Sequence, residues 1–423
     1  MIGAIPRREI VLPYPHPGQQ RVRREAKRFN WLAAGRRWRK TTLAMSIAVE
    51  EALRGKRIIW GAPTYDQVRV AWQESKHAAG GVALFQESRM TALWPRGGVI
   101  LFRSLDDPNN ARGHTADGAI VDEAGDVRAD AWYEVLRPML LDTGGWAWCV
   151  GTPRGRNWFW IEHQRALDLP DSAVWQAPTL GVRITEAGLV REPHPLENPH
   201  VALAEIEQLW RTMPERSFRQ EILAEFVEDG GGVFRRVREA AQAEPQAQAQ
   251  AGHAYVIGVD WGKYDDFTVL AVVDCNINEL VALDRFNQVD YAIQVGRLRA
   301  LYERFRPWII LAEQNAAGEP IIEQLQRQGL PVWPFLTTHK SKTEAIDTLA
   351  LAFEQQALKI LPEPVLIAEL EAYEAQRLPS GALRYGAPAG LHDDCVMALA
   401  LAWFAASQPR PRITRLRWGG RNE

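Results

Sequence analysis

Short apolar runs alternate with a helical pattern in the first part of the chain. Apolar runs fall at 57–63, 97–104, 118–124 and 145–153, and residues 43–53 (LAMSIAVEEAL) repeat apolar positions with the period of a helix. Strands that alternate with helices predict a parallel sheet covered on both faces. In such a sheet, functional side chains lie at the carboxyl ends of the strands.

The second part of the chain shows a different order of patterns. Residues 254–274 contain two apolar runs separated by a turn after Asp260, and 279–286 form a third run. The tight connections predict an antiparallel meander. A helical pattern, a buried strand at 307–315 and a strongly apolar helix at 390–406 follow. The chain is therefore predicted to be α/β in both halves.

Breaks in these patterns predict the domain boundaries. Residues 156–228 mix Pro, Trp and charged positions with a helical run, which predicts a small helical subdomain that closes over the first domain. Three glycines and the Ala/Gln-rich residues 240–252 follow, as in a hinge and linker. The predicted ranges are 1–228 for the first domain, 229–252 for the hinge and linker, 253–408 for the second domain and 409–423 for a basic tail.

Composition narrows the class of protein. Hydrophobic residues make up 46% of 423 positions, which is enough for two or three cores, and core packing is expected for most of the 17 tryptophans. The net charge of −2 excludes a uniformly basic nucleic-acid binder, so DNA contacts would come from local clusters. Three separated cysteines form no disulfide or zinc framework, and no signal region or apolar run of about 18 residues is present. The cytoplasm is the expected compartment, with no membrane partner.

The stretch 31–42 (WLAAGRRWRKTT) has the features of a phosphate-binding loop. A Gly/Arg-rich turn offers backbone N–H groups, and Lys40 and Thr41 follow at a helix start, where they could reach a nucleotide phosphate and its magnesium ion. Ala34 and Arg39 replace the two glycines of the usual pattern, so Arg39 must adopt backbone angles that normally favour glycine. The alternative is a basic helix start that caps a core helix. The predicted loop consists of Ala34, Gly35, Arg36, Arg37, Trp38, Arg39, Lys40, Thr41 and Thr42.

Polar residues at two later strand ends strengthen this prediction. Asp122 and Glu123 end the run 118–124, where they could hold magnesium and polarise a water molecule. With Lys40 and Thr41 upstream, they predict an ATPase with an added strand between the two motifs. Thr152, in a sharp turn after the next strand, could sense the γ-phosphate; the alternative is a plain strand exit.

Two further candidates belong to the same predicted site. Arg112 has no apolar context and could project toward the nucleotide of a neighbouring subunit, or be a solvated arginine. Gln19 precedes the loop, and its amide could read an adenine edge; the alternative is a solvated helix start.

Carboxylates of the second half form another set. Asp260 ends a first strand, Glu313 ends a later strand, and Asp393 and Asp394 open the last helix, which is the layout of a ribonuclease-H-like metal site. Two magnesium or manganese ions could there bridge a scissile phosphate, with Asp266 as a further ligand. The alternative is that each acid is a turn or cap residue, Asp393 being an N-cap.

Basic residues near this set suggest contacts with DNA. Residues 339–342 (HKSK) open a helix and could neutralise DNA phosphates, or be a solvated helix start. The arginine-rich tail 409–423 could contact a portal or a DNA backbone, or have no role.

The order of GRRWRKTT, IVDEA, VGTPRG, a Gly-rich hinge, GVDWG, LAEQN and HDDCVMALALA resembles the large terminase subunit of tailed double-stranded DNA bacteriophages. The resemblance covers residues 14–408. It implies an N-terminal P-loop ATPase of the ASCE type with a helical lid, and a C-terminal ribonuclease-H-like nuclease. It further implies ATP-driven translocation of double-stranded DNA into a procapsid and endonuclease cutting of concatemers, with ATP and Mg²⁺ or Mn²⁺ as cofactors. The implied partners are DNA, a portal protein, a small terminase subunit and further copies of the chain in a ring of five, in the host cytoplasm.

The resemblance also implies a role for each matching residue. Lys40 is similar to the phosphate lysine, Thr41 to the magnesium hydroxyl, Arg36 to an arginine kept inside the loop, Asp122 to the magnesium carboxylate, Glu123 to the catalytic base, Thr152 to the coupling residue, Arg112 to a trans-acting arginine finger and Gln19 to the adenine reader. Asp260, Glu313 and one of Asp393 or Asp394 are similar to the nuclease acids, and Asp266 to an accessory ligand.

Two other functions remain open on the sequence alone. The chain could be a helicase-like ATPase whose second domain grips DNA without cutting it. It could also be a non-catalytic DNA-binding or structural protein with a decayed phosphate loop, which the departure at Arg39 makes worth testing.

Overall fold

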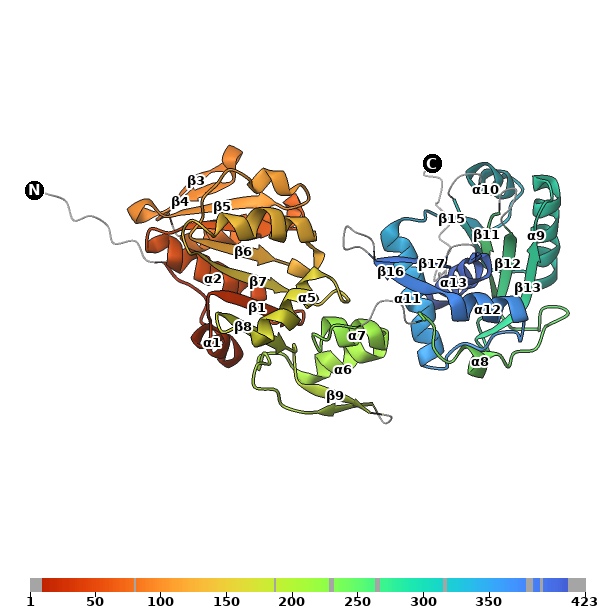
Figure 1. Cartoon of the computed structure of the whole chain (residues 1–423). Helices are drawn as coiled ribbons and strands as arrows, with labels where there is room; N and C mark the ends of the chain where they lie inside the picture. The colour runs from red at the N-terminus through yellow and green to blue at the C-terminus, as the bar shows by residue number, and fades with distance from the viewer. Residues whose placement is uncertain are drawn as a thin grey trace, which may run out of the picture. The chain divides into compact units, whose positions relative to one another are not determined.

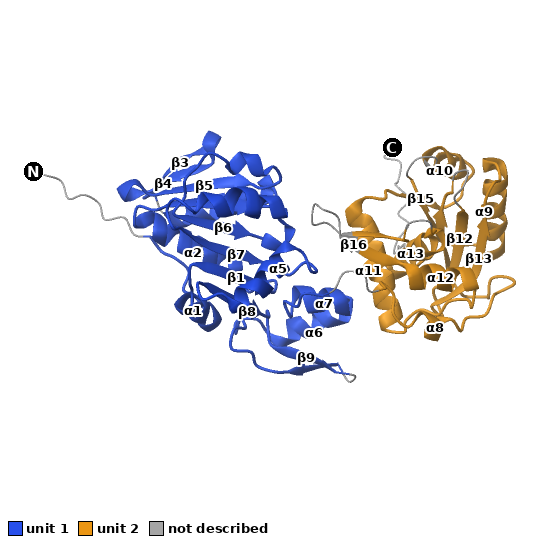
Figure 2. Cartoon of the chain, viewed as in Figure 1, with its two compact units in different colours: residues 1–229, 376–383 blue, residues 230–375, 384–423 orange. Residues whose placement is uncertain are grey.

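The computed structural model describes residues 10–79, 81–185, 188–227, 232–262, 267–314, 318–377, 383–388 and 391–409. The chain divides into two units (Figure 2). Unit 1 consists of Met1–Asp229 and Gln376–Leu383, and unit 2 of Gly230–Ala375 and Arg384–Glu423. Each unit is built around one central sheet (Figure 1).

The sheet of unit 1 has eight strands in the order β3-β4-β5-β2-β6-β7-β1-β8. The six strands from β5 to β8 in this order run parallel, and β4 and β3 add an antiparallel edge. The predicted parallel sheet is therefore confirmed. The strands are β1 Phe29–Ala34, β2 Arg57–Ala62, β3 Leu84–Gln86, β4 Thr91–Leu93, β5 Val99–Ser104, β6 Gly118–Asp122, β7 Trp146–Gly151 and β8 Ser172–Ala177.

Helices and buried tryptophans cover both faces of this sheet. One core includes Trp38, Trp60 and Trp72, and the opposite core includes Trp31 and Trp132, whose rings meet edge to face at 5.3 Å. Parallel strands need such cover because both of their faces are apolar. The helices are α1 Pro17–Arg24, α2 Lys40–Leu53, α3 Tyr65–Ala79, α4 Arg137–Met139, α5 Trp158–Arg165, α6 Leu203–Thr212 and α7 Glu215–Glu221, with a π-helical turn at Ala131–Leu136.

The segment 156–228 differs from the predicted helical subdomain. Its β8 pairs with β1 and completes the main sheet, and β9 (Val182–Thr185) and β10 (Gly188–Arg191) form a hairpin. Only α6 and α7 match the expected helical lid, and they pack with the hairpin around Leu180, Ile206 and Phe218. The strand β8 is short, and its stability comes from pairing with β1, a distant part of the sequence.

The sheet of unit 2 has five strands in the order β13-β12-β11-β14-β15. β11, β12 and β13 form the predicted antiparallel meander, and β14 and β15 continue the sheet in parallel to β11. The strands are β11 Tyr255–Asp260, β12 Thr268–Asp274, β13 Glu279–Phe286, β14 Ile309–Glu313 and β15 Val332–Phe335, with a small sheet of β16 Glu374–Arg377 and β17 Leu383–Gly386. The helices are α8 Val237–Ala240, α9 Tyr291–Phe305, α10 Gly318–Arg327, α11 His339–Glu354, α12 Pro364–Ala372 and α13 Asp394–Ser407.

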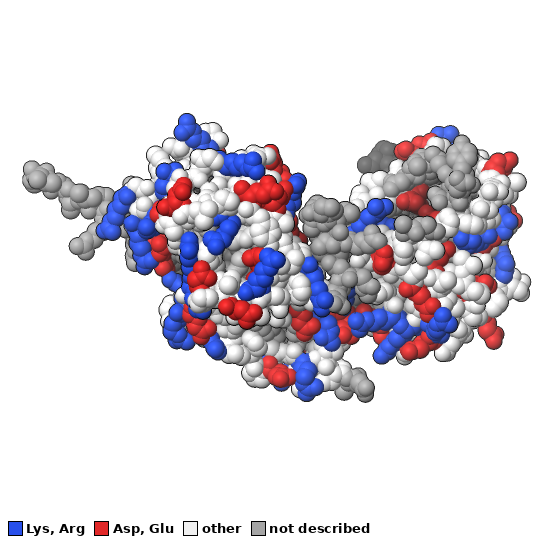
Figure 3. Space-filling model, in the orientation of Figure 1, with Lys and Arg blue, Asp and Glu red and all other residues white. Residues whose placement is uncertain are grey.

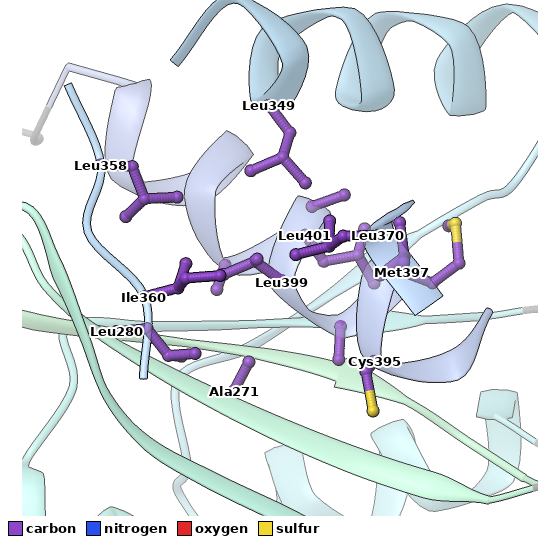
Figure 4. Packing of buried hydrophobic residues seen from close by; sticks show 14 of the residues in the cluster. Ala271, Leu280, Leu349, Leu358, Ile360, Leu370, Cys395, Met397, Leu399 and Leu401 are labelled. Carbon is purple, nitrogen blue, oxygen red and sulfur yellow. The ribbon is translucent and has the colours of Figure 1, made fainter. Parts of the chain in front are cut away.

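The helix α13 packs directly on the strand β11. A Cβ atom at Gly258 would lie 2.1 Å from the Ala398 carbonyl oxygen and 2.3 Å from the Ala402 nitrogen, so only glycine permits this approach. Apolar side chains of α13, including Leu399 and Leu401, join those of α11, α12 and the sheet in one core (Figure 4). The start of α13 is thereby fixed beside the end of β11.

The Ala/Gln-rich residues 240–252 differ from the predicted linker. The backbone nitrogens of Ala243, Gln246 and Ala249 donate to carbonyl oxygens of unit 2, at 3.0, 2.9 and 3.2 Å. Ala240 and Ala243 are buried. Composition predicts a linker because such residues rarely build a core, but here small side chains allow the backbone to lie against the domain. Part of the predicted glycine hinge lies outside the described residues.

The surface has mixed charge. On the face shown in Figure 3, Lys and Arg side chains are interspersed with Asp and Glu, as the net charge predicts. None of the helices in the described ranges is long and apolar enough to cross a membrane.

The contact at Gly258 generates a stability prediction. Gly258→Ala should destabilise unit 2 by about 1–3 kcal/mol, because the added methyl group overlaps the backbone of α13. Gly296→Ala, inside α9 and with open space around its Cβ position, is the matched control and should stabilise by about 0.5–1 kcal/mol. Urea unfolding monitored by circular dichroism measures both. Equal effects of the two substitutions would contradict the packing argument.

Candidate nucleotide and metal sites

The phosphate-binding loop lies between β1, which ends at Ala34, and α2, which begins at Lys40. Arg39 has φ 65° and ψ 40°, in the left-handed region, so the conformation expected for this position is confirmed. Arg37 also has a positive φ of 64°. A Cβ atom at Gly35 would lie 2.4 Å from Thr179 Oγ1, so glycine is required there.

Hydrogen bonds from distant segments hold this loop in its unusual conformation. Its carbonyl oxygens accept bonds from buried or half-buried side chains and therefore point into the surrounding protein. The bonds are Thr179 Oγ1 to Arg36 O at 2.5 Å, Asn198 Nδ2 to Arg37 O at 2.8 Å, and Gln19 Nε2 to Arg39 O at 3.0 Å. The N–H groups of the first turn of α2, which have no partner within the helix, suit an anion.

Gln19 is buried beneath this loop. Its side-chain oxygen accepts the backbone N–H of His16 at 3.0 Å, and its nitrogen donates to Arg39 O. The alternative of a solvated helix start is therefore wrong. Gln19 lines a small pocket together with Tyr14 and Thr42, and its role in reading adenine stays a prediction.

Lys40 joins side chains from three neighbouring strand ends. Its Nζ lies 3.0 Å from Glu123 Oε1 and 3.1 Å from Thr152 Oγ1, and Thr41 Oγ1 donates to Asp122 Oδ1 at 3.1 Å. The strands β6, β7 and β1 are adjacent in the sheet, so their carboxyl ends meet at one edge. A lysine, a hydroxyl and two carboxylates here match the chemistry of a magnesium-bound phosphate chain.

The Asp122 carboxyl group is buried at this edge. Burial, and then the charge of Glu123, raise the pKa of Asp122 to about 7, although Lys40 and Thr41 act in the opposite direction. A cation beside this group would favour its ionised form. The donor set therefore fits a divalent metal ion.

A second ionic network, which sequence analysis missed, braces the loop. Glu221 of α7 accepts a hydrogen bond from Arg36 Nε at 2.5 Å and another from Arg154. Arg154 also lies 3.1 Å from Asp126. Although burial acts to raise it, Arg154 and Arg36 hold the pKa of Glu221 below its ordinary value. Arg154 follows Thr152 in the turn after β7, but no sequence signal pointed to Glu221.

Arg112 lies apart from these contacts, on the loop between β5 and β6. Its side chain is 56% exposed and lies 3.5 Å from Glu134, so the expected exposure is confirmed. Its action on a neighbouring subunit stays a prediction.

The second set of acids gathers at one edge of the unit 2 sheet. Asp260 ends β11, Glu313 ends the adjacent parallel strand β14, and Asp394 begins α13. Asp393 occupies the N-cap position, but its side chain makes no capping hydrogen bond, so the interpretation as an N-cap alone is wrong. Asp266 lies outside the described residues.

These acids interact strongly with one another. Burial raises the pKa of Asp260 well above its ordinary value, and a hydrogen bond with Glu313 raises it further. The charges of Asp394 and Asp393 act in the same direction. Like charges held together in this way require a cation to ionise fully.

The described residues nevertheless contain no group of three His, Cys, Asp or Glu side chains arranged to hold a metal ion. Asp393 Oδ2 lies 3.2 Å from Lys342 Nζ, and Asp394 Oδ2 accepts the backbone N–H of Phe267 at 3.3 Å. The acids thus lie near one another, but two of them face other partners. The predicted shared metal ions stay a prediction.

A buried pair that sequence analysis missed supports the start of α13. Glu369 Oε2 accepts the backbone N–H of Cys395 at 2.8 Å, and its other oxygen lies 3.6 Å from Arg285. The Arg285 guanidinium stacks 3.3 Å over the Phe267 ring. This pair therefore links α12, β13 and the two residues next to Asp394. Residues 410–423 of the basic tail lie outside the described residues.

The buried state of Asp122 generates a pH prediction. In the unfolded chain this acid ionises near its ordinary pKa, but in the fold only near pH 7, so stability falls as the pH rises between these values. Asp122→Asn removes that loss and keeps an oxygen for Thr41. The nucleotide-free variant should gain more in Tm at pH 8 than at pH 5. A gain independent of pH, measured by calorimetry, would show that the buried charge of Asp122 is not the cause.

Comparisons with known proteins support the two-unit arrangement. The family described as "Terminase RNaseH-like domain" matches residues 257–406. A terminase large subunit of Thermus virus P23-45 is 31% identical over 71% of this chain, and the match spans 64% of that relative, less than two thirds of its length. The terminase large subunit of Thermus phage G20c is 28% identical over 93% of this chain and 88% of the relative.

A solved structure of the large terminase from another thermophilic bacteriophage covers 92% of this chain and 97% of its own, with a TM-score of 0.59 and 15% identity. At that identity it shows a shared fold. The sequence matches extend from the phosphate-loop unit through the ribonuclease-H-like unit. This chain belongs to the family of phage terminase large subunits.

Proposed function

We propose that the chain is the ATP-hydrolysing and DNA-cutting subunit of a phage DNA-packaging motor. The observation that carries this proposal is the position of Lys40, 3.0 Å from Glu123 and 3.1 Å from Thr152 at the sheet edge. Membership of the terminase family supports it, and the interacting acids of unit 2 support the second activity.

ATP hydrolysis would use this sheet edge. Lys40 and the N–H groups at the start of α2 bind the phosphate chain, and Lys40 exchanges its contact with Glu123 for a phosphate oxygen. Thr41 and Asp122 would hold the magnesium ion, which neutralises charge on the phosphates. Glu123, released from Lys40, orients the attacking water and accepts its proton. Thr152 then loses or keeps its contact with Lys40 according to the state of the phosphate chain.

The ATPase proposal predicts separable effects on binding and hydrolysis. Lys40→Ala should abolish ATP hydrolysis and weaken nucleotide binding, because the ammonium contacts the phosphates. Glu123→Gln should retain binding but lose roughly a hundredfold or more in kcat, because it removes the base. Phosphate release and fluorescent-nucleotide binding measure these effects. Lys56→Ala, which removes an exposed ion pair with Asp117, is the control.

An inert wild-type protein in the same assay would instead favour a non-catalytic DNA-binding protein. Activity retained in Lys40→Ala would remove the phosphate-loop assignment.

DNA cleavage would use the acids of unit 2. Asp260, Glu313 and Asp393 or Asp394 fit magnesium or manganese by their chemistry, because they are clustered oxygen donors that lack sufficient opposite charge. Bound divalent ions would activate a water molecule and stabilise the leaving oxygen. The buried strands β11 and β14 keep Asp260 and Glu313 in place, and the packing of α13 does so for Asp394.

The nuclease proposal predicts that plasmid cleavage in Mn²⁺ depends on Asp260. Asp260→Asn should reduce the cleavage rate at least about a hundredfold, since the substitution removes a ligand charge. Asp284→Asn, which breaks an ion pair with Arg297 in the same unit, is the control and should cleave normally. Cleavage unaffected by Asp260→Asn, or absent from the wild type, would favour the helicase-like alternative in which this unit only grips DNA.

Assembly and partners are also part of the proposal. The motor acts on double-stranded DNA, docks on a portal protein of the procapsid, receives DNA from a small terminase subunit and works as a ring of five chains in the host cytoplasm. The exposed Arg112 would reach the nucleotide of the neighbouring subunit in that ring.

A further inference from the structure

Lys342 is the closest lysine contact of the unit 2 acids. It lies in the first turns of α11 with its side chain 25% exposed, and its Nζ is 3.2 Å from Asp393 Oδ2. The same nitrogen lies 5.9 Å from the ring centre of Tyr373, which is fully buried. Lys342 thus faces the acids instead of being part of a solvated helix start.

The fold fixes this lysine beside the acids. Thr338 and Ser341 form a capping box that sets the first turn of α11. On the following turns, Ala345, Ile346 and Leu349 pack in the same core as α13 (Figure 4). Neither helix can move away without breaking this core, so the contact between Lys342 and Asp393 is built into unit 2.

The charges around this contact are unbalanced. Asp260, Glu313, Asp393 and Asp394 lie near one another, and among the described residues their recorded ion pairs are with Lys342 and with His392, 3.6 Å from Asp394. Histidine carries a charge only when protonated. Arg285, the nearby guanidinium, is engaged with Glu369 and the Phe267 ring. Lys342 therefore supplies the permanent positive charge in direct contact with the four acids.

We propose that Lys342 is the resident counter-ion of the nuclease acids, and that a divalent cation must displace it from Asp393 to bind. The inference rests on the proposed nuclease function. It accounts for the absence, among the described residues, of three carboxylates arranged to hold a metal ion, since Asp393 faces the ammonium. Lys342 thereby sets how much metal the site needs and keeps it from closing around weakly bound ions.

Manganese binding to the full chain tests this proposal. Lys342→Gln should bind Mn²⁺ about tenfold more tightly than the wild type in isothermal titration calorimetry, because it removes both a competitor for Asp393 and a like charge beside the ion. Lys342→Arg keeps the charge and should bind as the wild type does. Lys340→Gln changes an exposed lysine two positions away and is the matched control.

Thermal unfolding provides a second measurement that does not depend on cleavage. Without metal, Lys342→Gln should unfold at a lower temperature than Lys340→Gln, since the acids lose their counter-charge, and Mn²⁺ should raise its Tm more than that of the wild type.

Three results would overturn the inference. Unchanged or weaker Mn²⁺ binding in Lys342→Gln would mean that the lysine does not compete with the metal. A change in Lys342→Arg equal to that in Lys342→Gln would mean that its charge is not the cause. Absence of Mn²⁺ binding in every variant would remove the proposed metal site together with this inference, whereas wild-type binding with equal affinity in Lys342→Gln removes the inference alone.

Discussion

Negative charge held together at the ends of buried strands is the constraint on which both units depend. An ionised carboxylate loses its hydration when it is buried, and a second carboxylate nearby adds repulsion. Asp122 and Glu123 are held in this state in unit 1, and Asp260 and Glu313 in unit 2. In each unit a lysine from the start of a helix provides the opposite charge, Lys40 in the first and Lys342 in the second.

The surrounding packing opposes this repulsion. In unit 1 the acids lie on a strand between two cores that cover both faces of the sheet. In unit 2 the absence of a side chain at Gly258 lets α13 lie against β11, which brings Asp394 and Asp260 together. Both arrangements leave a site whose charge is only partly balanced. Such a site can exchange its lysine contact for a ligand of the matching charge.

The conformation of the phosphate loop is a second constraint that the fold must satisfy. Two arginines have left-handed backbone angles, and hydrogen bonds to the loop carbonyls stabilise them. The pair of Arg36 and Glu221 also ties the loop to α7, and Arg154 ties α7 to the turn after β7. A change at the phosphate end of the site therefore reaches α7 through direct contacts.

The sequence by itself determined the two sheets, the strands that end in acids and the residues of the phosphate loop. These features depend on local periodicity and on side chains adjacent in the chain, such as Lys40 with Thr41 or Asp122 with Glu123. It also predicted the strain at Arg39, because a non-glycine residue at that position has few backbone choices. The strand β8 was missed, and residues 240–252 were predicted to be a linker, because both depend on backbone pairing with distant segments.

Only the tertiary structure decided the partners of the charged groups. Glu221, Glu369 and Lys342 carry no local pattern that separates them from solvated residues on a helix. Their positions depend on which helices pack against which strand ends. Burial then makes each unbalanced charge costly, so the fold pairs these residues with groups more than 25 positions away in the sequence.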